Sequence, residues 1–374
     1  MKTKSNFSKE IFELFDPSDF KDDCPYYDEI PTFLDCKKRI IAIGDIHGDL
    51  DVAIRSFKLA NLIDNDMNWI AIPADTVVVQ VGDQIDSFRE ANIIVSDKAE
   101  DLKVMEFFDD MHIRASKYGG AVYSLIGNHE LLNMLGRFEY VSKNNMYFNE
   151  YTNHVGEKVS GGFTRQALFD RINQNKSASG TLCKKIACNR PAIIIIGDIL
   201  FVHGGLLPEW IDELEYLNTS EKNKLIFLNK ILRKWILNKM DLFDDKTKTV
   251  TNNMINNIDS SPFWTRVFGM INSDVAITDD QSCKNILDKS LKVFKLGKMV
   301  IGHTPQGVTN NSEKSINGTC YTVDPNGVKK TNKLYRIDGG FSRAFDPYRG
   351  KKMVVEVLEI IDCEKFTIVR EQLD

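Results

Sequence analysis

Long apolar runs are missing from this chain of 374 residues. A helix that crosses a bilayer needs about 20 apolar residues in succession. The most apolar segment, residues 192–207, is interrupted by Asp198 and His203. The N-terminus has no apolar stretch typical of a secretory signal, and it is too acidic for a mitochondrial presequence. The sequence therefore predicts a cytoplasmic protein with no membrane partner.

The chain also lacks a surplus of basic residues and any closely spaced pair of cysteines. Its formal net charge is -5, so no broad positive field would attract polyanions, and we expect no nucleic-acid partner. The seven cysteines are odd in number, scattered, and include no CxxC pair typical of zinc or redox sites. This pattern favours a reducing compartment, with the cysteines acting as small buried apolar residues.

Apolar runs of strand length are present, and each ends at a small cluster of glycine and polar residues. Residues 39–43 form a buried-strand pattern that stops at Gly44, and helical spacing follows from Leu50. The pattern recurs at residues 76–81, 121–126, 199–202 and 298–301. Loops after the carboxyl ends of strands are where sites usually lie in α/β sheets. We therefore predict an α/β fold with its polar clusters along one rim.

The rest of the chain is predicted to form helices that cover the sheet and loops that connect the elements. Residues 131–190 and 206–261 read as helical cover, and the apolar spacing from Leu225 to Trp235 is too short for a coiled coil and predicts an amphipathic helix. Gly197-Asp198 reads as a hairpin turn. Polar residues 244–260 and 309–326 are predicted as surface loops. Residues 1–37 are predicted as an N-terminal extension and residues 38–374 as one domain.

The strand-end clusters hold most of the metal-binding side chains of the chain. Of only six histidines, four lie in these clusters, together with three aspartates and one asparagine: His47, His129, His203, His303, Asp45, Asp83, Asp86 and Asn128. Imidazole and oxygen donors without thiolate suit manganese, iron or zinc. The good ligands are too many for one open catalytic ion, but they divide between two ions if a carboxylate bridges. Two such ions can clamp both oxygens of a phosphoryl transfer and acidify a water molecule.

The order of the clusters resembles the signature of the calcineurin-like metallophosphoesterases. The motifs are, in order, GDIHG at 44–48, GDQID at 82–86, GNHE at 127–130, HGG at 203–205 and GHT at 302–304. Four further stretches resemble the bacterial-like, or Shewanella-like, branch of the phosphoprotein phosphatases: HGGLLPEW, SPFWTR, IGHTPQ and LYRIDGGFSRAF. The resemblance spans about residues 39–345. It implies a four-layer αββα sandwich with helical insertions over the active-site cleft.

The resemblance also implies a role for each motif residue. Asp45 and His47 would bind the first of two divalent or trivalent ions, and Asp83 would bridge. The second ion would be held by Asn128, His203 and His303. His129 would be the general acid, with Asp86 orienting its ring. Arg266, in the SPFWTR stretch, would bind phosphate oxygens through its fork of donors.

One position departs from the family pattern. The family has an arginine directly after the second aspartate of GDxxD, whereas this chain has Ser87. Arg89 and Arg137 are the candidates to replace that arginine. Loss of one phosphate-binding arginine would cost about a few kcal/mol of transition-state stabilisation.

The expected activity is hydrolysis of phosphomonoesters in a phosphoprotein or phosphopeptide by a metal-activated hydroxide. Phosphoserine and phosphothreonine are the favoured substrates, and phosphotyrosine stays open. The alternatives are a hydrolase of dinucleoside polyphosphates or nucleotides, and a scaffold or pseudophosphatase, which Ser87 alone favours. We interpret Asp49 and Asp198 as cap or turn residues. Glu130 is expected to hold its loop.

Overall fold

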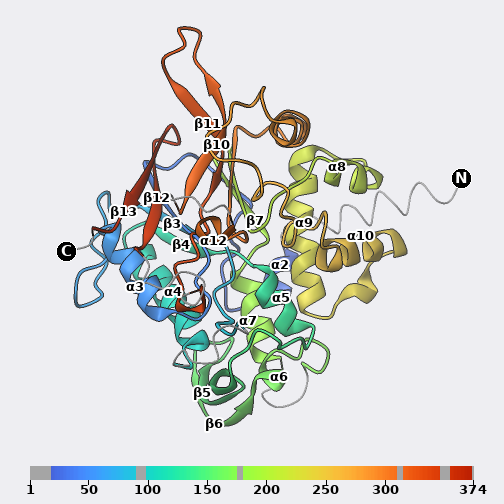
Figure 1. Cartoon of the computed structure of the whole chain (residues 1–374). Helices are drawn as coiled ribbons and strands as arrows, with labels where there is room; N and C mark the ends of the chain where they lie inside the picture. Colours follow the sequence, from blue (N-terminus) through green and yellow to red (C-terminus); the bar gives the residue numbers. More distant parts are fainter. Residues whose placement is uncertain (1–17, 90–97, 175–179, 310–314, 346–353, 373–374) are drawn as a thin grey trace, which may run out of the picture.

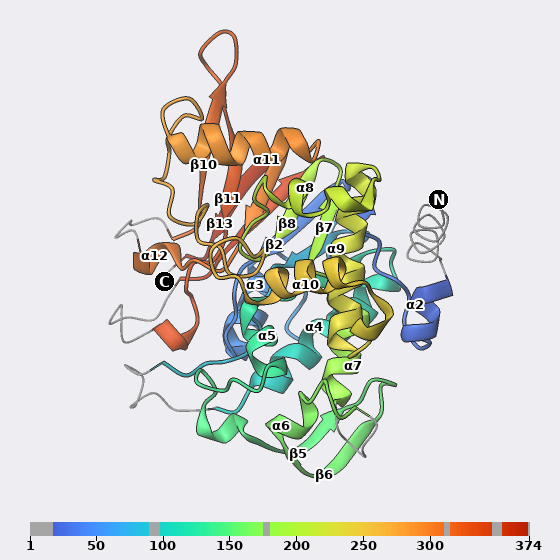
Figure 2. The ribbon, with the colours of Figure 1, turned by 90° about the vertical axis from the view of Figure 1, so that its right-hand side faces the viewer.

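The computed structural model describes residues 18–89, 98–174, 180–309, 315–345 and 354–372. Two β-sheets form its centre, and helices cover their outer faces (Figure 1, Figure 2). One buried core lies between the sheets and continues beneath the helices of the five-stranded sheet, and a second lies beneath the helices of the six-stranded sheet. This arrangement confirms the predicted αββα sandwich.

The five-stranded sheet carries the first three motifs. Its order is β13-β12-β2-β3-β4, and β2, β3 and β4 run parallel to one another. Its strands are β2 (Arg39–Ile43), β3 (Val77–Gln80), β4 (Ala121–Ser124), β12 (Glu356–Ile361) and β13 (Lys365–Arg370). Helices α3 (Leu50–Leu59) and α4 (Asp101–Ser116) cover its outer face, where Phe57 and Phe108 are buried in the core. The three parallel strands therefore bring their following loops to one edge.

The six-stranded sheet carries the last two motifs. Its order is β1-β7-β8-β9-β11-β10, and β8 and β9 are parallel neighbours. Its strands are β1 (Phe33–Leu34), β7 (Ile193–Ile196), β8 (Ile199–Val202), β9 (Lys298–Ile301), β10 (Asn317–Val323) and β11 (Lys330–Arg336). Strand β7 shows why the neighbouring strands β7 and β8 are apolar throughout. Ile193 and Ile195 face the core beneath the helices, while Ile194 and Ile196 face the core between the sheets.

Helices α7 (Thr181–Asn189) and α9 (Glu221–Ile236) pack over the six-stranded sheet. Helix α9 is the predicted amphipathic helix, and its stripe from Leu225 to Trp235 is buried. The remaining helices are α2 (Ser18–Asp23), α5 (Asn128–Met134), α6 (Arg165–Leu168), α8 (Trp210–Glu213), α10 (Asp245–Asn256), α11 (Asp288–Val293) and α12 (Gln306–Thr309). Among the described residues, every helix is too short or too polar to pass through a bilayer.

Three predictions of local structure are wrong. Residues 245–256 form helix α10, not a loop, because Asp244 caps its first turn and Val250 and Met254 are buried one turn apart. Residues 317–323 form strand β10, although the same tract was expected to be a loop. The cover between Leu131 and Arg190 is not wholly helical, since β5 (Tyr147–Thr152) and β6 (Lys158–Thr164) pair as a hairpin.

The extension predicted for residues 1–37 is described from residue 18 onward. There, Asp19 and Asp23 of α2 form ion pairs with Arg233 and Lys234 of α9. Strand β1 pairs with β7 at the edge of the six-stranded sheet. This segment is therefore joined to the sandwich, and the boundary at residue 37 stays a prediction.

The prediction of unpaired cysteines is wrong for six of the seven. Disulfides join Cys24 to Cys188, Cys36 to Cys363 and Cys283 to Cys320, and Cys183 is free and buried. The partners lie 164, 327 and 37 residues apart, so spacing along the sequence gave no sign of the pairs. A reducing compartment therefore has no support from the cysteines.

A thiol count tests this pairing. We expect the native protein to show no thiol that reacts with dithionitrobenzoate, because burial raises the pKa of the Cys183 thiol. Unfolding in guanidinium without a reductant should release one thiol, and reduction should release all seven. Seven thiols in the unfolded protein before reduction would contradict the disulfides.

Candidate metal centre

The loop after β3 places Asp83 among the imidazoles of other strand-end loops. Its Oδ2 lies 3.3 Å from Nε2 of His203 and 3.9 Å from Nε2 of both His47 and His129. Within the described part of the chain, two groups of buried donors share Asp83, one with His47 and His129 and the other with His203 and His303. Asp83 therefore lies between two candidate cation positions.

Asp45 and Asn128 join the same cluster from β2 and the start of α5. Asp45 Oδ2 lies 3.9 Å from Nε2 of His47, and both of its oxygens accept from the backbone N–H of His303. Asn128 Oδ1 lies 2.9 Å from Nε2 of His203. All of these side chains are buried. The structure thus brings the six predicted ligands together in one place.

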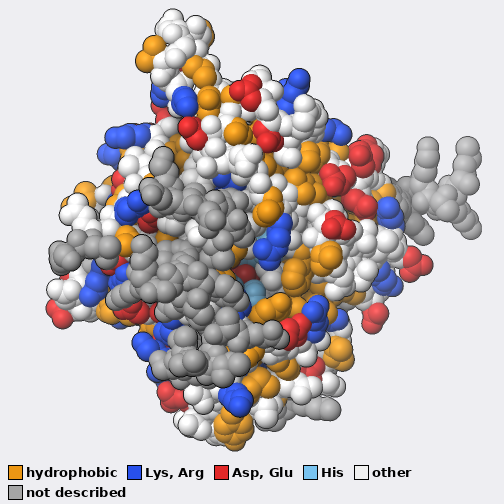
Figure 3. Space-filling model, viewed as in Figure 1, with side chains coloured by type: hydrophobic (Ala, Val, Ile, Leu, Met, Phe, Trp, Pro, Cys, Tyr) orange, Lys and Arg blue, Asp and Glu red, His pale blue; other side chains and the backbone are white. Residues whose placement is uncertain are grey.

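The cluster is open on one face of the molecule. Figure 3 shows histidine surface, in pale blue, near the middle of the face seen in Figure 1, with acidic surface directly beside it. His129 and His303 keep 7% and 4% of their surface exposed, whereas His203 has none. A small ligand can therefore reach the edge of the cluster while its base stays closed.

Several cluster residues have unusual backbone conformations. His47, Asp83, Asp86 and His303 have φ angles of 45°, 54°, 74° and 66°, in the left-handed region that side chains rarely adopt. Such residues cost about 1–3 kcal/mol each and persist where the surrounding structure fixes them, mostly at functional sites. The backbone strain at all four residues is typical of a functional site, where the position of a side chain matters more than its contribution to stability.

Glu130 fixes two of the motif loops together, as expected. Its carboxylate accepts from the backbone N–H groups of Asp83, Gln84 and Gly127 at 2.8–3.0 Å. The backbone N–H of His129 in turn donates to Oδ1 of Asp83 at 2.9 Å. These bonds set the distance between the loops after β3 and β4.

Two buried carboxylates of the cluster differ in how far the surrounding protein compensates their negative charge. Burial, together with the neighbouring carboxylates of Asp338 and Asp83, holds the pKa of Asp45 well above its usual range. Burial also acts to raise the pKa of Asp83, but the imidazoles of His203 and His129 outweigh it and hold that pKa well below its usual value. A bound cation would relieve the repulsion at Asp45.

Two of the imidazoles are held in the neutral form that binds metal. Burial, and then the charge of Arg89, holds the pKa of His47 well below its usual value. Burial, and then His203, does the same to the pKa of His303. Burial lowers the pKa of His203 as well, but the carboxylate of Asp83 outweighs it and raises that pKa. Neutral imidazoles, carboxylates and an amide oxygen make a donor set that fits manganese, iron or zinc.

His129 and Asp86 form a direct pair at the edge of the cluster. His129 Nδ1 lies 2.9 Å from Oδ2 of Asp86, so this nitrogen donates to the carboxylate. The other ring nitrogen, Nε2, faces Asp83. The ring also makes edge contacts with His47 and Tyr140, at centroid distances of 4.9 Å and 5.0 Å. The carboxylate therefore fixes which ring nitrogen points into the cluster.

The structure separates the three arginine candidates. Arg89 is half-buried at the cluster, with Nη2 3.3 Å from Nδ1 of His47 and its guanidinium over the ring of Tyr140. Arg266 is exposed, two residues after Trp264, whose carbonyl accepts from Nε2 of His303. Arg137 leaves 58% of its side chain exposed and pairs with Glu139. Arg89 is thus the candidate in direct contact with a predicted ligand.

Three residues that contact Asp86 of the Asp86–His129 pair were not predicted from the sequence. They are Asp101 in α4, Asn133 in α5 and Arg165 at the start of α6. Arg165 lies 79 residues after Asp86 and outside every motif. No local pattern marks it, because its partners come from three separate helices and loops.

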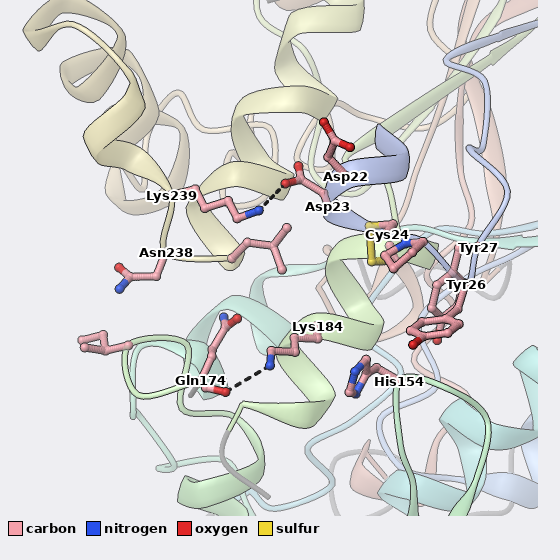
Figure 4. Close-up of a pocket in the computed structure, with 14 residues that line it drawn as sticks. Asp22, Asp23, Cys24, Tyr26, Tyr27, His154, Gln174, Lys184, Asn238 and Lys239 are labelled. Atoms are coloured by element: carbon pink, nitrogen blue, oxygen red, sulfur yellow. Dashed lines mark hydrogen bonds and ion pairs between the residues drawn. A yellow bond between two sulfur atoms is a disulfide. The ribbon is translucent and has the colours of Figure 1, made fainter. Parts of the chain in front are cut away.

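A cavity lies apart from the cluster. It has a volume of about 500 Å³ and is formed by α2 and the residues after it, the β5–β6 loop, α7 and the end of α9 (Figure 4). The Cys24–Cys188 disulfide forms part of its wall, and Lys239 pairs with Asp23 beside it. None of the predicted ligands or phosphate-binding residues lines this cavity, so it is not the predicted catalytic cleft.

Comparison with known proteins agrees with this geometry. The family described as calcineurin-like phosphoesterase matches residues 38–307. An uncharacterised protein of Acanthamoeba polyphaga mimivirus is 46% identical over 266 residues, which cover 71% of this chain and 98% of that protein. Shewanella-like protein phosphatase 2 of Arabidopsis thaliana is 27% identical over 340 residues, which cover 84% of this chain and 74% of that protein.

A solved structure shares the fold. The cold-active protein-tyrosine phosphatase of a psychrophilic Shewanella superposes with a TM-score of 0.56 at 20% identity, over 91% of this chain and 83% of that one. The predicted resemblance to the Shewanella-like phosphatases is confirmed by these relatives. The chain therefore belongs to the calcineurin-like phosphoesterase family and is a metal-dependent phosphatase.

Proposed function

We propose that this protein removes phosphate from phosphoproteins with the help of two metal ions that share Asp83. The observation that carries the proposal is the position of Asp83 between two groups of buried donors. Asp45 and His47 would hold one ion, and Asn128, His203 and His303 the other. Bound ions would supply Lewis acidity that draws charge from the phosphate and makes a water molecule acidic.

The residues of the chain divide the remaining work. A water oxygen forms the new bond to phosphorus, and the bond from phosphorus to the leaving oxygen breaks. His129 gives its Nε2 proton to that leaving oxygen, while Asp86 holds the ring through Nδ1. The guanidinium groups of Arg89 and Arg266 bind the phosphate oxygens.

A substrate panel tests the proposal. We favour a protein substrate, because the Arabidopsis relative is named a protein phosphatase. Phosphoserine and phosphothreonine stay the favoured residues, as the sequence resemblance implies. With manganese added, kcat/KM for phosphoserine and phosphothreonine peptides should exceed that for nucleotides and dinucleoside polyphosphates by about tenfold or more. Phosphotyrosine peptides belong in the same panel. Higher kcat/KM for nucleotides would overturn the proposed substrate, and no turnover of any substrate would support a scaffold.

The arginine that replaces the one missing at Ser87 can be identified by mutation. Arg89→Ala should lower kcat/KM for a phosphopeptide by about 100-fold, because a charge-assisted contact to the reacting phosphate is lost. Arg137→Ala is the matched control and should change kcat/KM less than about twofold, since exposed ion pairs contribute little. Steady-state kinetics decide the matter. A larger loss in the Arg137 variant would reverse the assignment.

A further inference from the structure

A buried arginine from outside the motifs contacts the carboxylate that orients His129. The side chain of Arg165, the first residue of α6, has no exposed surface. Its Nη2 lies 2.7 Å from Oδ1 of Asp86, while Oδ2 of the same carboxylate contacts His129. On the other side, Nη1 lies 2.7 Å from Oδ2 of Asp101. The guanidinium is therefore fixed between two carboxylates, and one of them belongs to the proposed acid pair.

An asparagine ties this arginine to the helix that carries His129. Nε of Arg165 donates to Oδ1 of Asn133. Nδ2 of Asn133 donates to both oxygens of Asp86, at 2.9 Å and 3.0 Å, and to the backbone carbonyl of His129 at 2.8 Å. All three guanidinium nitrogens thus have partners, and the carboxylate is held by an arginine, an amide and an imidazole. The carboxylate has little freedom to rotate.

We propose that Arg165 is a positioning residue for the reaction: it fixes the Asp86 carboxylate so that the His129 ring points its Nε2 proton at the leaving oxygen. This inference rests on the proposed role of His129 as the acid. A catalytic group displaced by about 1 Å can lose about 100-fold in rate. The fork of an arginine can hold two carboxylates and an amide in fixed directions, whereas the ammonium of a lysine cannot.

A positioning role and a purely structural role predict different kinetics. A structural defect would lower turnover of every substrate by the same factor. Loss of proton donation affects mainly substrates with a basic leaving oxygen, because an acidic phenol leaves without a proton. Phenyl phosphate and 2,4-dinitrophenyl phosphate differ in this respect and share the same phosphoryl group. Their ratio of kcat values therefore reports on the acid.

Three variants of the full-length protein with manganese make the test. Arg165→Lys keeps the charge and removes the fork. The double variant Arg165→Met with Asp101→Asn removes one positive and one negative charge, so the buried charge stays balanced if the lysine variant fails to fold. Arg233→Lys is the matched control, because Arg233 is also buried and also pairs with two carboxylates, those of Asp19 and Asp23.

Arg165→Lys and the double variant should lower kcat for phenyl phosphate by about 100-fold and for 2,4-dinitrophenyl phosphate by less than about threefold. Arg233→Lys should leave the ratio unchanged. A second measurement is the proton NMR signal of His129 Nδ1–H in the metal-free protein, which is identified by its absence in His129→Ala. This signal should shift or broaden in the Arg165 variants and stay unchanged in Arg233→Lys.

Two results would overturn the inference. The first is an equal loss of kcat on both substrates, or no loss on either, in the Arg165 variants, while His129→Ala still loses kcat selectively on phenyl phosphate. In that case the proposed function stands and only the role of Arg165 is wrong. A His129→Ala variant without that selectivity would remove the acid role itself, and the inference with it.

Discussion

Asp83→Asn should lower kcat for a phosphopeptide by about 1,000-fold, which corresponds to about 4 kcal/mol in the activation barrier. Asp83 contributes to both groups of buried donors, and its pKa is held well below its usual value, so an ionised oxygen faces the imidazoles. An amide in its place has no charge to share between two cations. The metal content, measured by mass spectrometry of the dialysed protein, should fall from two ions per chain to one or none.

Asp49→Asn is the matched control for this experiment. Asp49 is also a buried aspartate after β2, but it caps α3 and pairs with Arg343. Asparagine caps a helix as well as aspartate does, so this change mainly removes the charge pair with Arg343. It should cost about 1 kcal/mol of stability or less and leave the metal content unchanged. If Asp83→Asn kept both ions and full activity, the shared-ligand account of the site would be wrong.

His129→Ala should lower kcat for a phosphoserine peptide by about 100- to 10,000-fold, the usual contribution of a general acid. The alkoxide of serine is a poor leaving group, so it depends strongly on the proton. The metal content should stay the same, because Nδ1 of His129 is bonded to Asp86 and the ring is proposed as an acid, not a ligand.

The same variant shows whether His129 is a general acid or a metal ligand. Nε2 of His129 lies close enough to His47 and Asp83 to be grouped with them as a metal donor. A parallel loss of one ion in His129→Ala would assign it as a ligand and contradict the acid role. His112→Ala is the control, since that half-buried ring bonds the carbonyl of Val122 in the neighbouring strand and should leave both kcat and metal content unchanged.

The part of the site that sequence could predict is the part built on strand ends. Each of Asp45, Asp83 and His303 follows an apolar run within three residues, and parallel strands bring such positions to one edge. The fold could be predicted for the same reason, because runs such as residues 193–196 have no polar face and need apolar cover on both sides.

The rest of the site could not be predicted because it depends on contacts between distant elements. Arg165 and Asp101 meet Asp86 only when the β5–β6 hairpin and α4 pack beside the loop after β3. A mostly polar composition also obscured helix α10, in which Val250, Met254 and Ile255 are the only buried apolar side chains. The disulfide partners, likewise, are far apart in the chain.

Anomalous diffraction from crystals of the manganese-loaded protein would show whether two ions share Asp83. We expect two peaks about 3.5–4 Å apart, with Asp83 in contact with both and the six predicted donors divided between them. A single peak, or two peaks of which only one touches Asp83, would contradict this expectation.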